Sequence, residues 1–464
     1  MAAPLERWSG LAMPRRRLLR LLAGGSAAAV LASCGRGRQG ADRGAEGASA
    51  RRVLNVWTLD LAPKFDGYIR GVIAAWEQQN PGITVRWTDV PWSSVERKLL
   101  AAVFARTAPD LVNLNPPFAA NLASKGGLLN LAPVLPSGAE QAYLPKIWQA
   151  GQQGGEQYAI PWYLTTRITM ANRQLVRQAG YDAPPSRWQD VPAYAAAIRR
   201  RTGKYALFMT VVPDDSAELL ETLVQMGVQL LDDDHRAAFN SPAGREAFAF
   251  WSGLYRQDLL PKEVVSQGYR RAIELYQAGD LAQVATGPDF LTNLQTNAPR
   301  IAAATAPYPP LLGVSGEANV AMMNLVVPKQ SALAAEAVSF GLFLTNATNQ
   351  LRFANEARVL PSSPTALASV LASLEQPAPV QEGKEGKAGK AANAGHALVR
   401  SARLLSAQTL EHARVLVPAT PGVKRLQAIV YTQLQRAMLG ELSSDAALAQ
   451  AEQEWNRYAA ARWP

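Results

Sequence analysis

Apolar segments alternate with amphipathic helical segments near the start of the chain, and this alternation most constrains its fold. The strand-like segments have the β-branched, apolar character of buried strands, whereas the helical ones repeat apolar residues every three to four positions. The predicted strands are 53–58, 83–87 and 111–114, and the predicted helices surround 69–76 and 94–106. The order βαβαβ predicts a parallel sheet with right-handed crossovers, whose ligands gather at the carboxyl ends of its strands.

Similar α/β patterns continue through the rest of the chain. Periodicity predicts further helices at 192–200, 334–357, 401–416 and 424–439, and a strand at 205–211. Residues 376–397 are rich in Pro, Gly, Lys, Glu and Ala, and we interpret them as a low-complexity, solvated surface loop whose role the sequence leaves open. With 464 residues, of which 48% are hydrophobic, the chain is long enough for two domains with sizeable cores.

The net charge of +10 is concentrated at the N-terminus. Residues 1–52 hold ten Arg and three acids, so seven of the ten net charges lie there. A nearly neutral remainder does not favour a nucleic-acid partner.

The N-terminal segment has the pattern of a signal peptide. Four arginines between residues 15 and 20 precede an apolar run at 21–32, which is too short to span a membrane. The stretch 31–35 resembles the lipobox of bacterial lipoproteins, in which the chain is cleaved before a lipidated Cys, here Cys34. We therefore expect a signal peptide at 1–33 and a lipidated, flexible tether at 34–52. Export by the general or the twin-arginine route, and a start at Met1 or Met13, remain open.

Residues with metal, cofactor or nucleophile chemistry are scarce. One Cys and three His leave little room for a zinc site or a disulfide framework. The acidic run at 232–234 lacks the spaced oxygens of a calcium loop, and no phosphate-binding glycine-rich motif is present. We expect no catalytic residues, no metal and no cofactor.

Seven stretches, in this order, resemble the extracellular solute-binding proteins of family 1, the maltose-binding-protein-like, carbohydrate-binding lipoproteins of ABC importers. They run from the first predicted helix almost to the C-terminus. The stretches are 76–85, 108–114, 126–131, 158–163 with Asn172-Arg173, 276–282 with Gly287-Pro288, 359–362 and 440–448. The chain departs from the family pattern at 316–319 and 289–290.

The resemblance implies an α/β, two-lobed periplasmic-binding-protein fold with a multi-strand hinge. Each lobe is expected to hold a mainly parallel sheet flanked by helices. The expected lobes are 53–162 with 286–320, and 163–285 with 321–464. The implied protein is a non-enzymatic monomer, anchored outside the cytoplasmic membrane. It would bind a carbohydrate between its lobes and deliver it to a permease with cytoplasmic ATPases.

Candidate ligand-binding residues follow from sugar chemistry, since aromatic rings stack on sugar faces and polar side chains bond the hydroxyls. The candidates lie at strand ends, at the expected hinge, or at positions implied by the resemblance; for Trp57, core and cleft remain equal readings. The aromatic candidates are Trp57, Trp92, Trp162, Tyr163 and Phe290, and the polar ones are Asp60, Asn115, Arg167, Asp214, Asp289, Asn319 and Arg358.

Three alternatives remain open. The same fold could bind a non-sugar solute, or could present its ligand to a chemoreceptor. A secreted glycoside hydrolase would need two facing carboxylates, and the adjacent pair Asp214-Asp215 does not favour one because neighbouring side chains rarely face each other. The sequence does not name the sugar.

Overall fold

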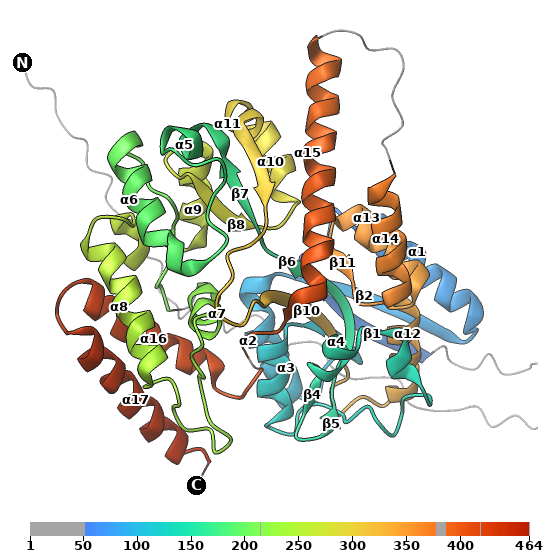
Figure 1. Ribbon diagram of the computed structural model, residues 1–464. Coiled ribbons are helices and arrows are strands. Elements are labelled where there is room, and N and C mark those ends of the chain that lie inside the picture. Colours follow the sequence, from blue (N-terminus) through green and yellow to red (C-terminus); the bar gives the residue numbers. More distant parts are fainter. Residues whose placement is uncertain (1–51, 214, 377–386, 418, 464) are drawn as a thin grey trace, which may run out of the picture. The chain divides into compact units, whose positions relative to one another are not determined.

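Strand β1 (Arg52–Leu59) pairs in parallel with β2 (Ile83–Val90) on one side and β3 (Leu111–Leu114) on the other. Helices α1 (Asp66–Gln79) and α2 (Trp92–Phe104) connect these strands (Figure 1). The pairing confirms the predicted parallel βαβαβ unit. It is seen in the computed structural model, which describes residues 52–213, 215–376, 387–417 and 419–463. All of these residues belong to one compact unit.

The larger sheet extends this unit with strands from later parts of the chain, in the order β11–β6–β10–β3–β1–β2, and β12 pairs with β10. Strand β10 runs antiparallel to both β3 and β6, so the sheet is mixed. The added strands are β6 (Ile160–Thr166), β10 (Ala318–Val326), β11 (Leu360–Pro361) and β12 (Ala413–Arg414).

The smaller sheet has the order β8–β7–β9, and all its pairs are antiparallel. Its strands are β7 (Ile168–Asn172), β8 (Gln283–Thr286) and β9 (Thr305–Tyr308), and β4 (Gln152–Gln153) with β5 (Glu156–Gln157) forms a separate hairpin. The strand directions therefore depart from the mainly parallel sheets that we expected in each lobe. Short apolar runs reveal that a strand is buried but not which way its neighbours run.

The strand pairing also differs from the expected lobe bounds. Strand β9, expected in the first lobe, pairs in the smaller sheet, whereas most of β10, expected in the second, pairs in the larger one. The chain passes from the larger to the smaller sheet at Arg167, between β6 and β7. The largest apolar core surrounds the smaller sheet, and a separate core surrounds β1 and β6.

Helices cover both sheets, and α15 contacts β6 of the larger sheet as well as β7 and β9 of the smaller one (Figure 1). The remaining α-helices are α3 (Pro116–Ala123), α4 (Pro145–Gln149), α5 (Arg173–Gln178), α6 (Val191–Thr202), α7 (Glu218–Gln225), α8 (Pro242–Arg256), α9 (Tyr269–Ala278), α10 (Phe290–Asn297), α11 (Pro299–Ala304), α12 (Ala334–Leu344), α13 (Ala347–Ala357), α14 (Pro364–Glu375), α15 (Lys387–Thr409), α16 (Val423–Met438) and α17 (Ser444–Ala460). The 3₁₀ turns are η1 (Ala139–Ala142), η2 (Trp188–Asp190), η3 (Lys262–Val265) and η4 (Leu410–His412).

The helices predicted at 192–200 and 424–439 are confirmed as α6 and α16. The helix predicted at 334–357 is divided into α12 and α13, because the side chain of Asn346 accepts a hydrogen bond from the backbone of Asn349 and caps a new helix.

Three other predictions about local structure differ from the structure. The segment 205–211 forms no strand and makes only an isolated bridge at Tyr205. The helix expected at 401–416 is confirmed as part of α15 but ends earlier, at Thr409. From Lys387 onward, the expected surface loop at 376–397 is part of α15, whose later residues pack between the sheets.

Among the described residues, no helix combines the length and apolarity needed to cross a bilayer. The expected signal peptide, Cys34 and the expected tether up to residue 51 lie outside the described residues, as does Asp214. Arg52, the last residue of the expected tether, is the first residue of β1.

Candidate functional site

A cavity of about 420 Å³ lies between elements of the larger sheet and helices packed on the smaller one. We call it the cleft cavity. Its walls include the start of α2, the residue that caps α3, strands β6 and β10, and helices α7 and α16. Its aromatic and polar lining residues are Trp92, Asn115, Tyr163, Thr165, Asp215, Glu221, Asn319, Lys424 and Gln427. The cavity therefore brings together four of the predicted site residues, Trp92, Asn115, Tyr163 and Asn319.

Trp92 offers the most accessible aromatic surface in this cavity, since 42% of the residue is exposed. It is the first residue of α2, and its backbone N–H donates a 2.7 Å hydrogen bond to the carboxylate of Asp60. A carboxylate at a helix N-terminus is favoured by the helix dipole and by the free N–H groups there. Asp60 does not line the cleft cavity; it holds the turn that places Trp92.

Tyr163 is half-buried and lies edge-on to Trp162 and Phe353, with ring centroids 5.2 Å away in each case. Burial, with the charge of Asp89 nearby, holds the pKa of the Tyr163 hydroxyl above its ordinary value. The residue therefore presents a neutral hydroxyl and a fixed ring to the cavity.

The two asparagines of the cavity each make a local hydrogen bond. Asn115 caps α3, because its side-chain oxygen accepts from the backbone N–H of Phe118 at 3.0 Å. The side-chain oxygen of Asn319 accepts from the backbone N–H of Leu416 at 3.1 Å. Both amides are thus fixed in orientation, and an amide whose oxygen is bonded still has two N–H donors.

The opposite wall contains charged and amide groups that sequence reasoning missed. Lys424, on α16, forms an ion pair with Glu96 of α2, and thereby joins the two sides of the cavity. The side-chain N–H of Gln427 donates to the carbonyl oxygens of Pro213 and Ser216, at 2.8 and 3.2 Å.

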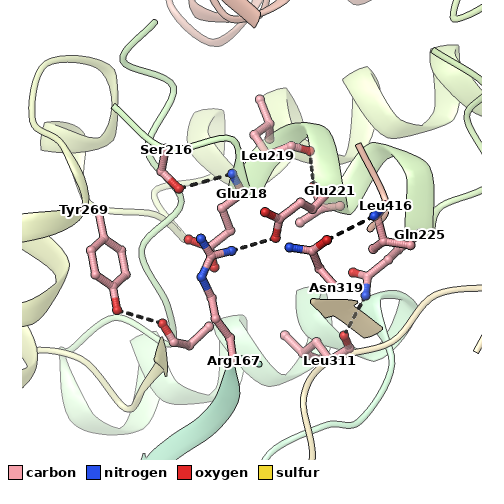
Figure 2. Close-up of polar contacts among 12 residues, drawn as sticks. Arg167, Ser216, Glu218, Leu219, Glu221, Gln225, Tyr269, Leu311, Asn319 and Leu416 are labelled. Atoms are coloured by element: carbon pink, nitrogen blue, oxygen red, sulfur yellow. Dashed lines mark hydrogen bonds and ion pairs between the residues drawn. The ribbon is translucent and has the colours of Figure 1, made fainter. Parts of the chain in front are cut away.

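Arg167 lies at the crossing between the sheets and forms an ion pair with Glu221, Nη1 to Oε2 2.6 Å (Figure 2). Glu218, one turn earlier on α7, lies beside the same guanidinium. Burial raises the pKa of the Glu218 carboxyl to about 7, and the charge of Arg167 offsets only part of this effect. Arg167 does not line the cleft cavity; it lines a smaller, adjoining one.

These acids had a sequence signal that we did not use. Glu218, Glu221, Thr222 and Gln225 are spaced i, i+3, i+4 and i+7, so they share one face of α7. A polar stripe on a helix that also carries a buried apolar face indicates either a solvated surface or a polar site, and the tertiary structure decides between the two.

Two of the predicted aromatic residues are buried in apolar cores. Trp162 is 0% exposed and stacks on Phe353 in the core of the larger sheet. Phe290 is buried in the core of the smaller sheet, 6.0 Å from the ring of Tyr276. Trp162 directly follows Pro161 and Phe290 lies two residues after Pro288, but both side chains are buried in the cores, where no ligand face is available.

Trp57, Arg358 and Asp289 do not line the cleft cavity. Trp57 is half-buried and packs against an apolar cluster that contains Leu59. Arg358 ends α13 and donates a hydrogen bond to the hydroxyl of Thr292, and Asp289 is exposed just before α10.

Within the described residues, no group of three or more His, Cys, Asp or Glu side chains is placed to hold a metal ion.

The family described as bacterial extracellular solute-binding protein matches residues 62–351. Among solved structures, an oligosaccharide periplasmic-binding protein from Synechococcus sp. MITs9220 is 63% identical; the match covers 89% of this chain and 100% of that one, with a TM-score of 0.82. The sugar-binding protein MalE from Xanthomonas citri is 23% identical over 88% of this chain and 98% of that chain, with a TM-score of 0.70. The latter shows the two-lobed fold alone.

A binding protein of Brucella abortus is 21% identical over 258 residues, which is 55% of this chain and 63% of the relative. The match thus spans less than two thirds of this curated relative.

Proposed function

The chain belongs to the bacterial extracellular solute-binding protein family, and from this we propose that it is the substrate-binding subunit of an ABC importer that binds a carbohydrate reversibly in the cleft cavity. The observation that carries the proposal is the lining of that cavity. An accessible indole and a fixed tyrosine lie on one side, and carboxylate, ammonium and amide groups lie on the other. This combination suits sugars, which present apolar faces together with rings of hydroxyls.

The proposed ligand contacts are the candidates that line the cavity. Trp92 and Tyr163 would stack on sugar faces, and Asn115 and Asn319 would donate to hydroxyls with their side-chain N–H groups. Glu221, Asp215, Lys424 and Gln427 join them as hydrogen-bonding groups from the opposite wall. We propose that one lobe is built around the larger sheet and the other around the smaller sheet, in place of the lobe bounds expected from the sequence. The ligand would then contact elements of both lobes.

Partners and anchoring complete the proposal. The protein would act as a monomer, release its ligand to a membrane permease, and be held at the outer face of the cytoplasmic membrane through lipid on Cys34. Mass spectrometry of the membrane-extracted mature protein should find an acylated N-terminal Cys34. The variant Cys34→Ala should be recovered without lipid, and an unmodified Cys34 in the wild-type protein would refute the anchor.

The direct test of the function is a titration of the purified protein with mono-, di- and trisaccharides and polyols, followed by tryptophan fluorescence and calorimetry. We expect at least one carbohydrate to bind saturably, at micromolar or lower Kd, and to be recovered unchanged. Absence of binding across the panel would refute a carbohydrate ligand. Recovery of cleavage products would instead indicate a hydrolase.

A further inference from the structure

A second, smaller cavity adjoins the cleft cavity, because Glu221 and Asn319 line both. We call it the side chamber; it is further lined by Arg167, Glu218, Gln225 and Gln283. Its volume is about 70 Å³. A cavity of that volume has room for roughly five water molecules, or for a polar group of comparable size.

The chamber is built from polar groups that the fold removes from solvent. Glu218 is 8% exposed and Gln283, on β8, is 3% exposed, although both residue types ordinarily lie at the surface. The apolar face of α7, which includes Leu219 and Leu223, packs in the core and so turns the polar stripe of the helix toward the chamber. The polar lining is therefore a consequence of how α7 is seated.

Some of these polar groups are already satisfied within the protein. The side-chain N–H group of Gln225 donates to the carbonyl oxygen of Leu311 (Figure 2). It also donates to the carbonyl oxygen of Glu317, and the side-chain oxygen of Gln225 accepts from Trp188. Asn319 accepts from Leu416. These residues form a fixed frame for the chamber.

Two acceptors in the chamber are not satisfied in this way. The side-chain oxygen of Gln283 is buried and has no hydrogen-bond partner among the described residues. No described residue donates a hydrogen bond to the carboxylate of Glu218 either. A buried acceptor without a donor is destabilising, so a donor that enters the chamber would stabilise the Gln283 oxygen. The same donor could bond the Glu218 carboxylate, which lines the chamber.

The charges around the chamber decide which donors fit. The positive charge of the Arg167 guanidinium is balanced by the carboxylate of Glu221, with which it forms an ion pair. The other titratable groups near Glu218 are Asp215, Tyr269 and Tyr431. The carboxylate of Asp215 accepts a hydrogen bond from the backbone N–H of Tyr269. The hydroxyls of Tyr269 and Tyr431 donate to the carbonyl oxygens of Ala285 and Ser216, and burial raises both their pKa values. The chamber thus offers acceptors and carries no spare positive charge.

We propose that the side chamber is a compartment of the binding site that receives a hydroxyl-bearing, uncharged end group of the ligand, hydrogen-bonds it to Glu218 and Gln283, and rejects ligands that are anionic at that end. The inference rests on the proposed function, since the chamber opens beside the cleft cavity in which the ligand would lie. It adds a charge selection that the cleft cavity alone, with Lys424 in its wall, does not impose.

Calorimetry with three variants tests the proposal, using the tightest-binding neutral oligosaccharide of the panel. Gln283→Leu removes the unpartnered acceptor with little change of volume, and we expect it to weaken binding about tenfold, the scale of one or two lost hydrogen bonds. Gln153→Leu is the matched control: Gln153 also has a buried, unpartnered side-chain oxygen but lines neither the cleft cavity nor the side chamber. Its affinity should equal that of the wild-type protein.

The charge selection is tested with the same oligosaccharide carrying a carboxylate in place of the terminal hydroxymethyl group, at either end. The wild-type protein should bind one of the two acidic forms at least about tenfold more weakly than the neutral form, and Glu218→Gln should narrow that difference. Thermal denaturation of each variant checks that it is folded.

The outcomes separate the two proposals. Wild-type protein that binds no carbohydrate refutes the proposed function, and this inference with it. If the wild-type protein binds a carbohydrate, and Gln283→Leu and Glu218→Gln both bind the neutral and the acidic ligands with wild-type affinity, the side chamber is not a ligand compartment. The proposed function is then unaffected.

Discussion

The indole of Trp162 stacks on the ring of Phe353, with centroids 5.1 Å apart and an interplanar angle of 25°. This contact joins β6, at the crossing between the sheets, to α13, which packs on the larger sheet. Tyr163, the next residue along β6, also lies edge-on to Phe353, with centroids 5.2 Å apart, but it lines the cleft cavity as well. One strand therefore supplies a core aromatic residue and a cavity aromatic residue at consecutive positions.

Trp162→Ala should therefore affect stability rather than ligand contact. Removing a fully buried aromatic side chain leaves a cavity and destabilises the folded protein by about 3–5 kcal/mol. Urea denaturation should show a clearly lowered midpoint, while the folded fraction binds ligand within about threefold of wild type. A normal midpoint together with a large loss of affinity would place the ring in the ligand site after all.

Trp92→Ala should have the opposite effect. The side chain is accessible in the cleft cavity, so its loss should weaken carbohydrate binding about tenfold, the scale of one stacking contact, with little change in the denaturation midpoint. Phe104→Ala is a suitable control, because Phe104 is an 84% exposed aromatic residue at the other end of the same helix. Equal affinities for the two variants would contradict the role of Trp92.

Glu218 should make stability depend on pH. Its pKa rises from 4.5 to about 7 on folding, so the folded protein holds this proton more strongly than the unfolded chain does. The resulting stabilisation is present below about pH 4.5 and is lost as the pH rises through about 7. Between pH 5 and 8, Glu218→Gln should therefore gain about 2 kcal/mol of stability relative to wild type.

Denaturation midpoints at several pH values would measure this difference. Glu246→Gln, which replaces an exposed carboxylate on α8, should follow the wild-type pH profile. Parallel profiles for wild type and Glu218→Gln would mean that the Glu218 carboxyl is not perturbed.

The ion pair between Lys424 and Glu96 should contribute modestly to ligand affinity, because it joins α16 to α2 at the cleft cavity. Both side chains are partly exposed, so the pair is screened by water and salt. Glu96→Gln should weaken binding by about threefold or less at low ionic strength, and the difference should vanish near 0.5 M salt. A double-mutant cycle with Lys424→Gln measures the pairwise term, and a salt-independent loss would point to another cause.

The sequence was informative where the determinants of structure are local. The first three strands and their helices were predictable, because apolar runs and helical spacing report burial directly. The break between α12 and α13 was missed, although it rests on a local signal, the capping side chain of Asn346. The directions of β7, β8 and β9 were not predictable, since their partners lie more than a hundred residues apart along the chain.

The residues of the candidate site were likewise predictable from the sequence only in part. Trp92, Asn115 and Tyr163 could be chosen from the sequence, because they follow or lie on strands that end at one edge of a sheet. Trp162 was misplaced, since its burial depends on stacking against Phe353, a residue of α13 far along the chain that the local sequence does not reveal.

The sequence by itself determined the two-lobed α/β class, through its periodicity and its ordered resemblance to one family. Only the tertiary structure decided that α7 turns Glu218 and Glu221 toward Arg167, and that α16 brings Lys424 and Gln427 to the cavity. The physical reason is that a polar helix face has the same sequence pattern whether it is exposed to water or packed against another element. Its role depends on which distant residues pack against it.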